Sequence, residues 1–150
     1  MKETAVFTNM CMVYDEKGNV LVQNRVDPEW GGITFPGGHV EKGESFTDSV
    51  IREIREETGL TIRNPRICGV KQFFLEDGTR YVVLCYKTCH FTGQLTSSLE
   101  GQMSWVRLED MENMKLARGM EYMIRLFLDD SVSEHIIILE KNGEKRNVLQ

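Results

Sequence analysis

Residues 37–60 read GGHVEKGESFTDSVIREIREETGL and carry the strongest helix signals of the chain. Ser45 followed by Asp48 resembles a capping box, with aspartate in place of the usual glutamate or glutamine, and Gly59 suits a left-handed helix end. The apolar residues between these signals recur at helical spacing and are Phe46, Val50, Ile51 and Ile54. We therefore predict an amphipathic helix over residues 46–58.

The polar face of this helix carries three glutamates, Glu53, Glu56 and Glu57. Spacings of three and four residues place their carboxylates on one face, where like charges repel each other unless a cation neutralises them. Hard divalent ions prefer oxygen ligands, and magnesium takes a few carboxylates together with waters and substrate phosphates. The alternative is a solvated acidic face with Arg52 and Arg55 as partners, and the spacing by itself leaves both open.

The residues around the glutamates form a longer pattern. Five residues separate Gly38 from Glu44, and seven more separate Glu44 from the run REIREETGL at residues 52–60. These residues match all nine specified positions of G-x5-E-x7-R-E-U-x-E-E-x-G-U, in which U is aliphatic. The pattern is the Nudix box, so the sequence resembles the Nudix hydrolase family, and the Phe35-Pro36-Gly37-Gly38 run and the order of elements extend the resemblance over most of the chain.

The resemblance implies a magnesium site, with manganese as a substitute. In the family, the glutamates that match Glu53, Glu56 and Glu57 bind the ions, and a glycine carbonyl before the helix, here Gly37, is a further ligand. The implied reaction is attack of water on a phosphorus of a diphosphate linked to a nucleoside. The ions position the water, lower its pKa and neutralise charge on the transferring phosphoryl group.

Three further residues complete the predicted catalytic set. Glu44 lies just before the helix, where it could orient other carboxylates or hold a second ion. Arg52 lies four residues before Glu56, near enough to fix that carboxylate by a charge-assisted hydrogen bond. Glu100 is similar in position to an extra glutamate that MutT-like members of the family use for metal binding or general-base work, and the alternative is a surface loop residue.

The candidate substrate-binding residues lie outside the box. Arg25 ends a predicted strand, where MutT-like members place an arginine that contacts phosphates. Phe35 and Trp30 could stack on a base, although a core or loop-anchoring role is the alternative for both. Asn9 could recognise a base or be a satisfied core residue. Arg118 stands where members that hydrolyse 8-oxo-dGTP carry an asparagine for the oxidised purine, and this departure puts that specificity in doubt.

The resemblance is strongest to the MutT group, so we predict hydrolysis of a nucleoside triphosphate to monophosphate and pyrophosphate, with 8-oxo-dGTP or a related oxidised purine nucleotide favoured. The alternative is a diphosphatase on ADP-ribose, a nucleotide sugar or another nucleoside diphosphate derivative. Family members that hydrolyse ADP-ribose usually carry extra N-terminal sequence, whereas this chain begins almost at its first predicted strand. A nucleotide-binding module without catalysis is a third alternative, which the complete set of box glutamates disfavours.

The remaining sequence predicts an α+β domain over residues 1–150, with the Nudix fold of a mixed β-sheet flanked by helices as an α/β/α sandwich. Strands are expected at residues 4–14, 20–25, 60–76, 79–91 and 103–108, helices at 109–114 and 118–128, and a C-terminal hairpin at 135–148. Asp77-Gly78 is the predicted turn between the two long strands, and Asn142-Gly143 is the turn of the C-terminal hairpin. The first two strands suggest a hairpin about the turn DEKGN. The C-terminal hairpin could cover the sheet or mediate a dimer.

Composition limits the partners. The chain has 23 acidic and 18 basic residues and a net charge of −5, which disfavours binding to a nucleic acid polymer. The chain has no apolar run long enough for a membrane span, and its N-terminus does not resemble a secretory signal, so we expect a cytoplasmic protein. We expect it to act on a small-molecule nucleotide, as a monomer or a homodimer. Cys85 and Cys89 have the same parity and would share one face of the predicted strand, so a metal site with the neighbouring His90 is conceivable, but reduced thiols are the favoured interpretation.

Overall fold

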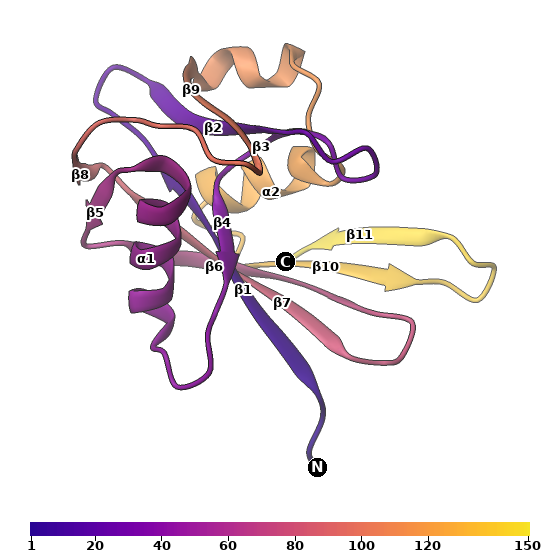
Figure 1. Cartoon of the computed structure of the whole chain (residues 1–150). Coiled ribbons are helices and arrows are strands. Elements are labelled where there is room, and N and C mark those ends of the chain that lie inside the picture. Colours follow the sequence, from indigo (N-terminus) through magenta and orange to yellow (C-terminus); the bar gives the residue numbers. More distant parts are fainter.

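A six-stranded mixed sheet forms the centre of the computed structural model, which describes residues 1–150 (Figure 1). Its strand order is β11-β10-β6-β7-β1-β4. The strands span Ala5–Val13 (β1), Gly37–His39 (β4), Arg66–Phe74 (β6), Arg80–Thr88 (β7), Glu134–Leu139 (β10) and Lys145–Leu149 (β11). β1 pairs in parallel with β7 and antiparallel with β4, which brings the glycine-rich segment onto the central strand.

Helices cover both faces of this sheet. One apolar cluster joins Met10 and Met12 of β1 to α2 (Met120–Leu128), and a second joins Cys11 and Val13 to α1 (Phe46–Thr58). Successive strand residues point to opposite faces, so β1 serves both clusters. The predicted α/β/α arrangement is thereby confirmed, with α1 on one side of the view and the β10–β11 hairpin projecting on the other (Figure 1).

A three-stranded sheet, β3-β2-β9, lies beside the central one (Figure 1). It consists of Gly32–Thr34 (β3), Asn19–Arg25 (β2) and Gly101–Arg107 (β9), and the short helix η1 (Leu108–Asn113) follows β9. The predicted hairpin of the first two strands is wrong, because β1 and β2 belong to different sheets and share only the bridge between Tyr14 and Val20. β1 is buried on both faces from Thr8 to Val13, so it takes a central position.

The two long strands predicted over residues 60–91 are each interrupted. Asn64 has φ of 52° and is followed by a proline, which separates β5 (Thr61–Arg63) from β6. Cys89 separates β7 from β8 (His90–Thr92), and β5 pairs with β8 as a two-stranded sheet. The turn at Asp77-Gly78 joins β6 to β7 as predicted, with φ of 84° at Gly78.

The C-terminal hairpin extends the sheet. β10 pairs in parallel with β6 and antiparallel with β11, so the hairpin continues the sheet sideways and leaves β11 as an edge strand. It does not cover a face, which was one of the two roles considered for it. No helix has the length and apolar character needed to cross a membrane.

Candidate active site

The helix α1 begins and ends where its capping signals predict. The Ser45 side chain accepts a hydrogen bond from the backbone N–H of Asp48, and Gly59 ends the helix in the left-handed conformation. Val50 and Ile54 are fully buried against the sheet, which turns the glutamates toward the surface. The Glu53 side chain is nevertheless only 13% exposed, whereas that of Glu56 is 56% exposed. Glu53 therefore lies at the inner edge of the acidic face.

Gly38 of β4 gives Glu53 its space. A Cβ atom placed on Gly38 would lie 2.2 Å from Oε2 of Glu53 and 2.6 Å from Oε1. The backbone φ of Gly38 is not in the left-handed region, so the requirement for glycine here is steric rather than conformational. The glycine backbone thus forms one wall of the Glu53 carboxylate site.

Gly38→Ala is expected to displace the Glu53 carboxylate and to lower kcat/KM by roughly 100-fold, since small misplacements of a catalytic group have effects of this size. Steady-state kinetics measures the loss, and thermal unfolding monitors the fold. Gly43→Ala is the matched control, because no atom lies within 4 Å of its Cβ position although its φ is 81°. Equal activity losses in both variants would contradict the steric explanation.

Arg52 connects the carboxylates of the box. Its guanidinium binds Glu44 through two hydrogen bonds, Nε to Oε2 at 2.7 Å and Nη2 to Oε1 at 2.9 Å. Nη1 donates to Glu53 at 2.9 Å and to Glu56 at 3.2 Å, and Nη2 also donates to the carbonyl of His39 at 2.9 Å. The planar fork of arginine suits this arrangement, which a lysine could not reproduce. Glu44 thus orients the other carboxylates through Arg52.

These contacts set the charge of the network. The hydrogen bonds that Arg52 donates lower the pKa of Glu44 to about 2, and the carboxylates of Glu44 and Glu53 that accept them raise the pKa of Arg52 further above its ordinary value. Both groups therefore stay ionised at any physiological pH.

The turn before β9 brings a fourth carboxylate to α1. The Ser98 hydroxyl donates to Oε2 of Glu57 at 2.5 Å and accepts from the backbone N–H of Glu100 at 3.2 Å. Ser98 was not among the residues singled out from the sequence, and only its place two residues before Glu100 offered a signal. The serine fixes the position of the turn relative to the helix.

The acidic groups repel one another. Burial raises the pKa of Glu53, and the charges of Glu56 and Glu57 add to this rise against the opposing contacts with Arg52. Burial also raises the pKa of Glu100, with further contributions from Glu57 and Glu53. A cluster of carboxylates that resist ionisation has an excess of negative charge, which a bound cation would relieve.

The donor set fits a hard divalent ion such as Mg²⁺, because all its members are carboxylate oxygens. No three acidic, histidine or cysteine side chains converge as ligands of one ion in this arrangement, in which Arg52 holds Glu53 and Glu56.

The four cysteines are free thiols, and Cys85 is fully buried, as expected for reduced cysteines. The predicted shared strand face of Cys85 and Cys89 is wrong, because β7 ends between them.

Two candidate substrate residues are engaged inside the protein. Phe35 is fully buried and packs edge-to-face on Phe127, with ring centroids 5.0 Å apart, so it is a core residue and its expected stacking on a base is corrected. Asn9 is 4% exposed; its Nδ2 donates to Ser49 at 3.0 Å and its Oδ1 accepts from the backbone N–H of Gly38 at 3.1 Å. Asn9 therefore ties β4 to α1, with both polar atoms occupied.

The remaining candidate substrate-binding residues are Arg25, Arg118 and Trp30. Arg25 ends β2 opposite Gly101, and its charge opposes the rise in the pKa of Glu100. Arg118 is exposed, with its guanidinium 5.9 Å from the Trp30 ring centroid. Trp30 is itself 54% exposed, so this pair forms a surface contact between two loops. The structure thus brings Arg25 to the acidic cluster and places Arg118 on the surface.

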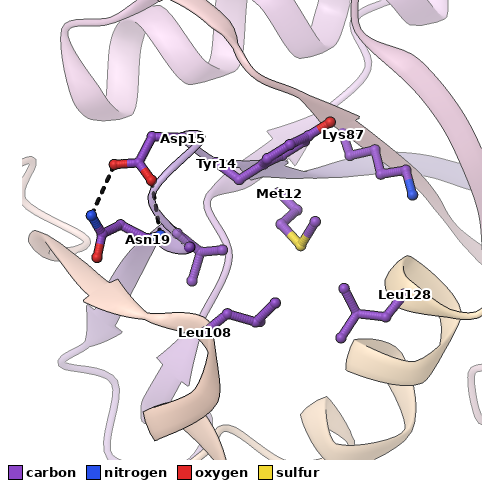
Figure 2. Close-up of a pocket in the computed structure, with 9 residues that line it drawn as sticks. Met12, Tyr14, Asp15, Asn19, Lys87, Leu108 and Leu128 are labelled. Carbon is purple, nitrogen blue, oxygen red and sulfur yellow. Dashed lines mark hydrogen bonds between the residues drawn. The ribbon is translucent and has the colours of Figure 1, made fainter.

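A separate cavity of about 230 Å³ lies beside the turn after β1 and the C-terminal end of α2 (Figure 2). Leu108 and Leu128 face Met12 across it, and Asp15 is its only carboxylate. Asp15 is occupied by hydrogen bonds from the Asn19 side chain and backbone, both 2.9 Å long. None of the lining residues belongs to α1, β4 or the turn that contains Glu100, so this cavity is distinct from the acidic site.

Comparison with known proteins agrees with the geometry. A family model described as the NUDIX domain matches residues 6–127. The chain is 38% identical over 117 residues to the "Uncharacterized Nudix hydrolase YvcI" of Bacillus subtilis (strain 168), a match covering 75% of this chain and 72% of that protein. An ADP-ribose pyrophosphatase of Methanocaldococcus jannaschii is 42% identical over 57 residues, covering 37% of this chain and 34% of that protein.

Among solved structures, the MutT protein of Bacillus halodurans is similar with a TM-score of 0.81 at 24% identity, covering 97% of each chain. At this level of identity the likeness concerns the fold. The family model, in contrast, spans most of the sequence, including the box and the strands around it. The protein therefore belongs to the Nudix hydrolases, which act on pyrophosphate bonds of nucleotide derivatives.

Proposed function

We propose that this protein hydrolyses a nucleoside triphosphate to the monophosphate and pyrophosphate in a magnesium-dependent reaction, with an oxidised purine nucleotide such as 8-oxo-dGTP as the favoured substrate. The observation that supports the proposal is that Arg25 stands opposite Gly101, next to Glu100, which brings a guanidinium group to the edge of the acidic cluster. The negative oxygens of a polyphosphate can contact metal ions held by the carboxylates and, at the same time, the guanidinium group of Arg25.

Each residue has a role in this reaction. Glu53, Glu56, Glu57 and Glu100, with the carbonyl of Gly37, would hold the ions, which when bound neutralise phosphate charge and acidify water. Arg52 keeps Glu53 and Glu56 in position, and Glu44 in turn keeps Arg52 in position. Glu100 and Glu53 have raised pKa values, which suits a carboxylate that accepts a proton from water. Arg25 binds a phosphate oxygen.

Hydrolysis of ADP-ribose or another nucleoside diphosphate derivative is the second candidate. It is favoured by the similarity to an ADP-ribose pyrophosphatase, although that match covers only 37% of this chain. The acidic cluster would serve either substrate. The distinction therefore lies in the groups that contact the nucleoside, which the box does not specify.

Product analysis decides between the two. The purified protein is incubated with magnesium in three parallel reactions, which contain 8-oxo-dGTP, dGTP or ADP-ribose. The products are separated by ion-exchange chromatography. Pyrophosphate released from 8-oxo-dGTP, with kcat/KM well above that for dGTP, is the expected result. Turnover of ADP-ribose with little activity on either triphosphate would overturn the proposed substrate and leave the assignment of the acidic site in place.

A further inference from the structure

Lys71 lies on the face of the central sheet that α2 covers. In the pairing of β6 with β7 it stands opposite Val83, a member of the apolar cluster beneath α2. A Cβ atom placed on Gly119, at the start of α2, would lie 3.3 Å from its Nζ. Gly69 lies on β6 two residues before Lys71, and a Cβ atom placed on it would meet Leu126 near the C-terminal end of α2. β6 thus runs beneath α2 and emerges at its start with Lys71.

The ammonium group of Lys71 has no ionic partner. It takes part in none of the ion pairs of the structure, whereas Lys87 on the neighbouring strand donates to the carbonyl of Phe127 at 3.0 Å. Burial is the largest influence on the pKa of Lys71 and lowers it; Cys85 opposes this shift, Arg25 adds to it, and Glu121 opposes it more weakly. A half-buried cation beside a like charge is unfavourable for folding, and such groups are concentrated at functional sites.

Arg25 relates Lys71 to the acidic cluster. In the sheet β3-β2-β9, Arg25 stands between Gly101, which follows Glu100, and Gly32. A Cβ atom on Gly32 would lie 2.7 Å from the backbone N of Ala117, three residues before α2 begins. The end of β2 at Arg25 therefore lies between the turn that contains Glu100 and the segment that leads into α2. A nucleotide with its phosphates on the carboxylates and Arg25 would extend its nucleoside toward Lys71.

The surface next to Lys71 is aromatic. Phe73 follows on the same face of β6, and its ring stacks on that of Tyr81 with centroids 4.8 Å apart and an interplanar angle of 22°. Nζ of Lys71 is 5.9 Å from the centroid of Phe73. Both rings are partly exposed, and they lie beyond the start of α2. A planar base could stack on these rings with one edge at the ammonium group.

We propose that Lys71 is a specificity-determining residue that donates a hydrogen bond to an exocyclic carbonyl oxygen of a purine base. An ammonium group has three donors and no acceptor, so it favours a carbonyl edge and gains nothing from the amino group of adenine. The inference rests on the proposed function, because it supposes a purine nucleotide with its phosphates on the acidic cluster. It names the group that would make the enzyme prefer guanine and oxidised guanine.

Equilibrium binding of nucleoside monophosphates tests this without relying on turnover. Isothermal titration of the full chain with 8-oxo-dGMP, dGMP and dAMP is compared for the wild type, Lys71→Met and Lys71→Arg. Lys71→Met is expected to weaken binding of the two carbonyl-bearing nucleotides by about 10- to 100-fold, as for a lost hydrogen bond to a charged group, and to leave dAMP nearly unchanged. Lys71→Arg should retain part of the preference.

Stability separates this role from a structural one. Lys71→Met should unfold at the same temperature as the wild type or higher, because the ammonium group has no partner inside the protein. Lys145→Met, on the exposed edge strand β11, is the control and should change neither property. Equal weakening of all three nucleotides would indicate a phosphate contact and overturn the proposal. Equal affinity of the wild type for all three nucleotides would also overturn the proposal, whether or not the protein hydrolyses triphosphates.

Discussion

Glu53→Gln should reduce kcat/KM on the enzyme's nucleotide substrate by on the order of a thousandfold, since a lost metal-ligating charge removes several kcal/mol of transition-state stabilisation. The effect is expected to be large because Glu53 is the most enclosed of the helix carboxylates that Arg52 binds, 13% exposed and against the backbone of Gly38. Glutamine keeps the volume and a hydrogen-bond acceptor for Arg52 and removes only the charge. Steady-state kinetics with magnesium measures the loss.

Thermal unfolding with and without magnesium supplies an independent measurement. Magnesium should raise the Tm of the wild type and not that of Glu53→Gln, because a ligand that binds only the folded state stabilises it. Without magnesium the variant should be at least as stable as the wild type, since burial and its acidic neighbours raise the pKa of Glu53 and make its charge costly. Asp48→Asn, an exposed acid in the first turn of the same helix, is the matched control.

The same variant separates an enzyme from a binding module. A protein that only bound its nucleotide would keep its function largely intact in Glu53→Gln. Full kcat/KM in this variant would contradict the assignment of Glu53 as a metal ligand.

Arg52→Gln should lower both activity and stability. The guanidinium donates to Glu44, Glu53, Glu56 and the carbonyl of His39, so its loss leaves Glu53 and Glu56 without a donor and Glu44 with only the backbone N–H of Glu41. We expect kcat/KM to fall by about 10- to 100-fold, as for other groups that orient metal ligands, and Tm to fall by several degrees. Arg52→Lys should recover only part of the activity, because an ammonium group cannot form the forked contact with Glu44.

The pH dependence of the Arg52 variant checks the origin of the stability loss. Hydrogen bonds from Arg52 lower the pKa of Glu44 from 4.5 to about 2. The stabilisation from Glu44 is therefore fully present above about pH 4.5 and is lost as the pH falls through about 2. The Tm difference between the wild type and Arg52→Gln should shrink over that range. Arg55→Gln, exposed on the same helix, is the control, and an equal loss in both variants would contradict the assignment.

Local signals predicted the helix of the site closely. The Ser45 cap, the Gly59 end and the apolar stripe depend on residues within one helix, so α1 spans residues 46–58 as expected. The turns at Asp77-Gly78 and Asn142-Gly143 were likewise predicted from adjacent residues, and they join the paired strands expected there. Such features need only short-range interactions, which a sequence displays directly.

Pairings between distant segments were predicted less well. Strand-like residues before and after a turn suggested that β1 and β2 form a hairpin, but β1 instead pairs in parallel with β7, more than 70 residues away in the sequence. Asn9 was left open between a base contact and a core role, and its bonds to Ser49 and Gly38 decide in favour of the core. The partners of a buried polar group are invisible until the chain is folded.

The sequence by itself determined the family, the acidic helix and the glycine beside it, because the box fixes residue types at positions close together in the chain. The tertiary structure decided how these parts work together. It placed Ser98, which holds the turn before Glu100, against Glu57, tied Asn9 to Ser49 and Gly38, and set Lys71 beside Gly119 at the start of α2. These contacts join residues from separate strands, turns and helices, and only packing of the sheets and helices brings them within reach.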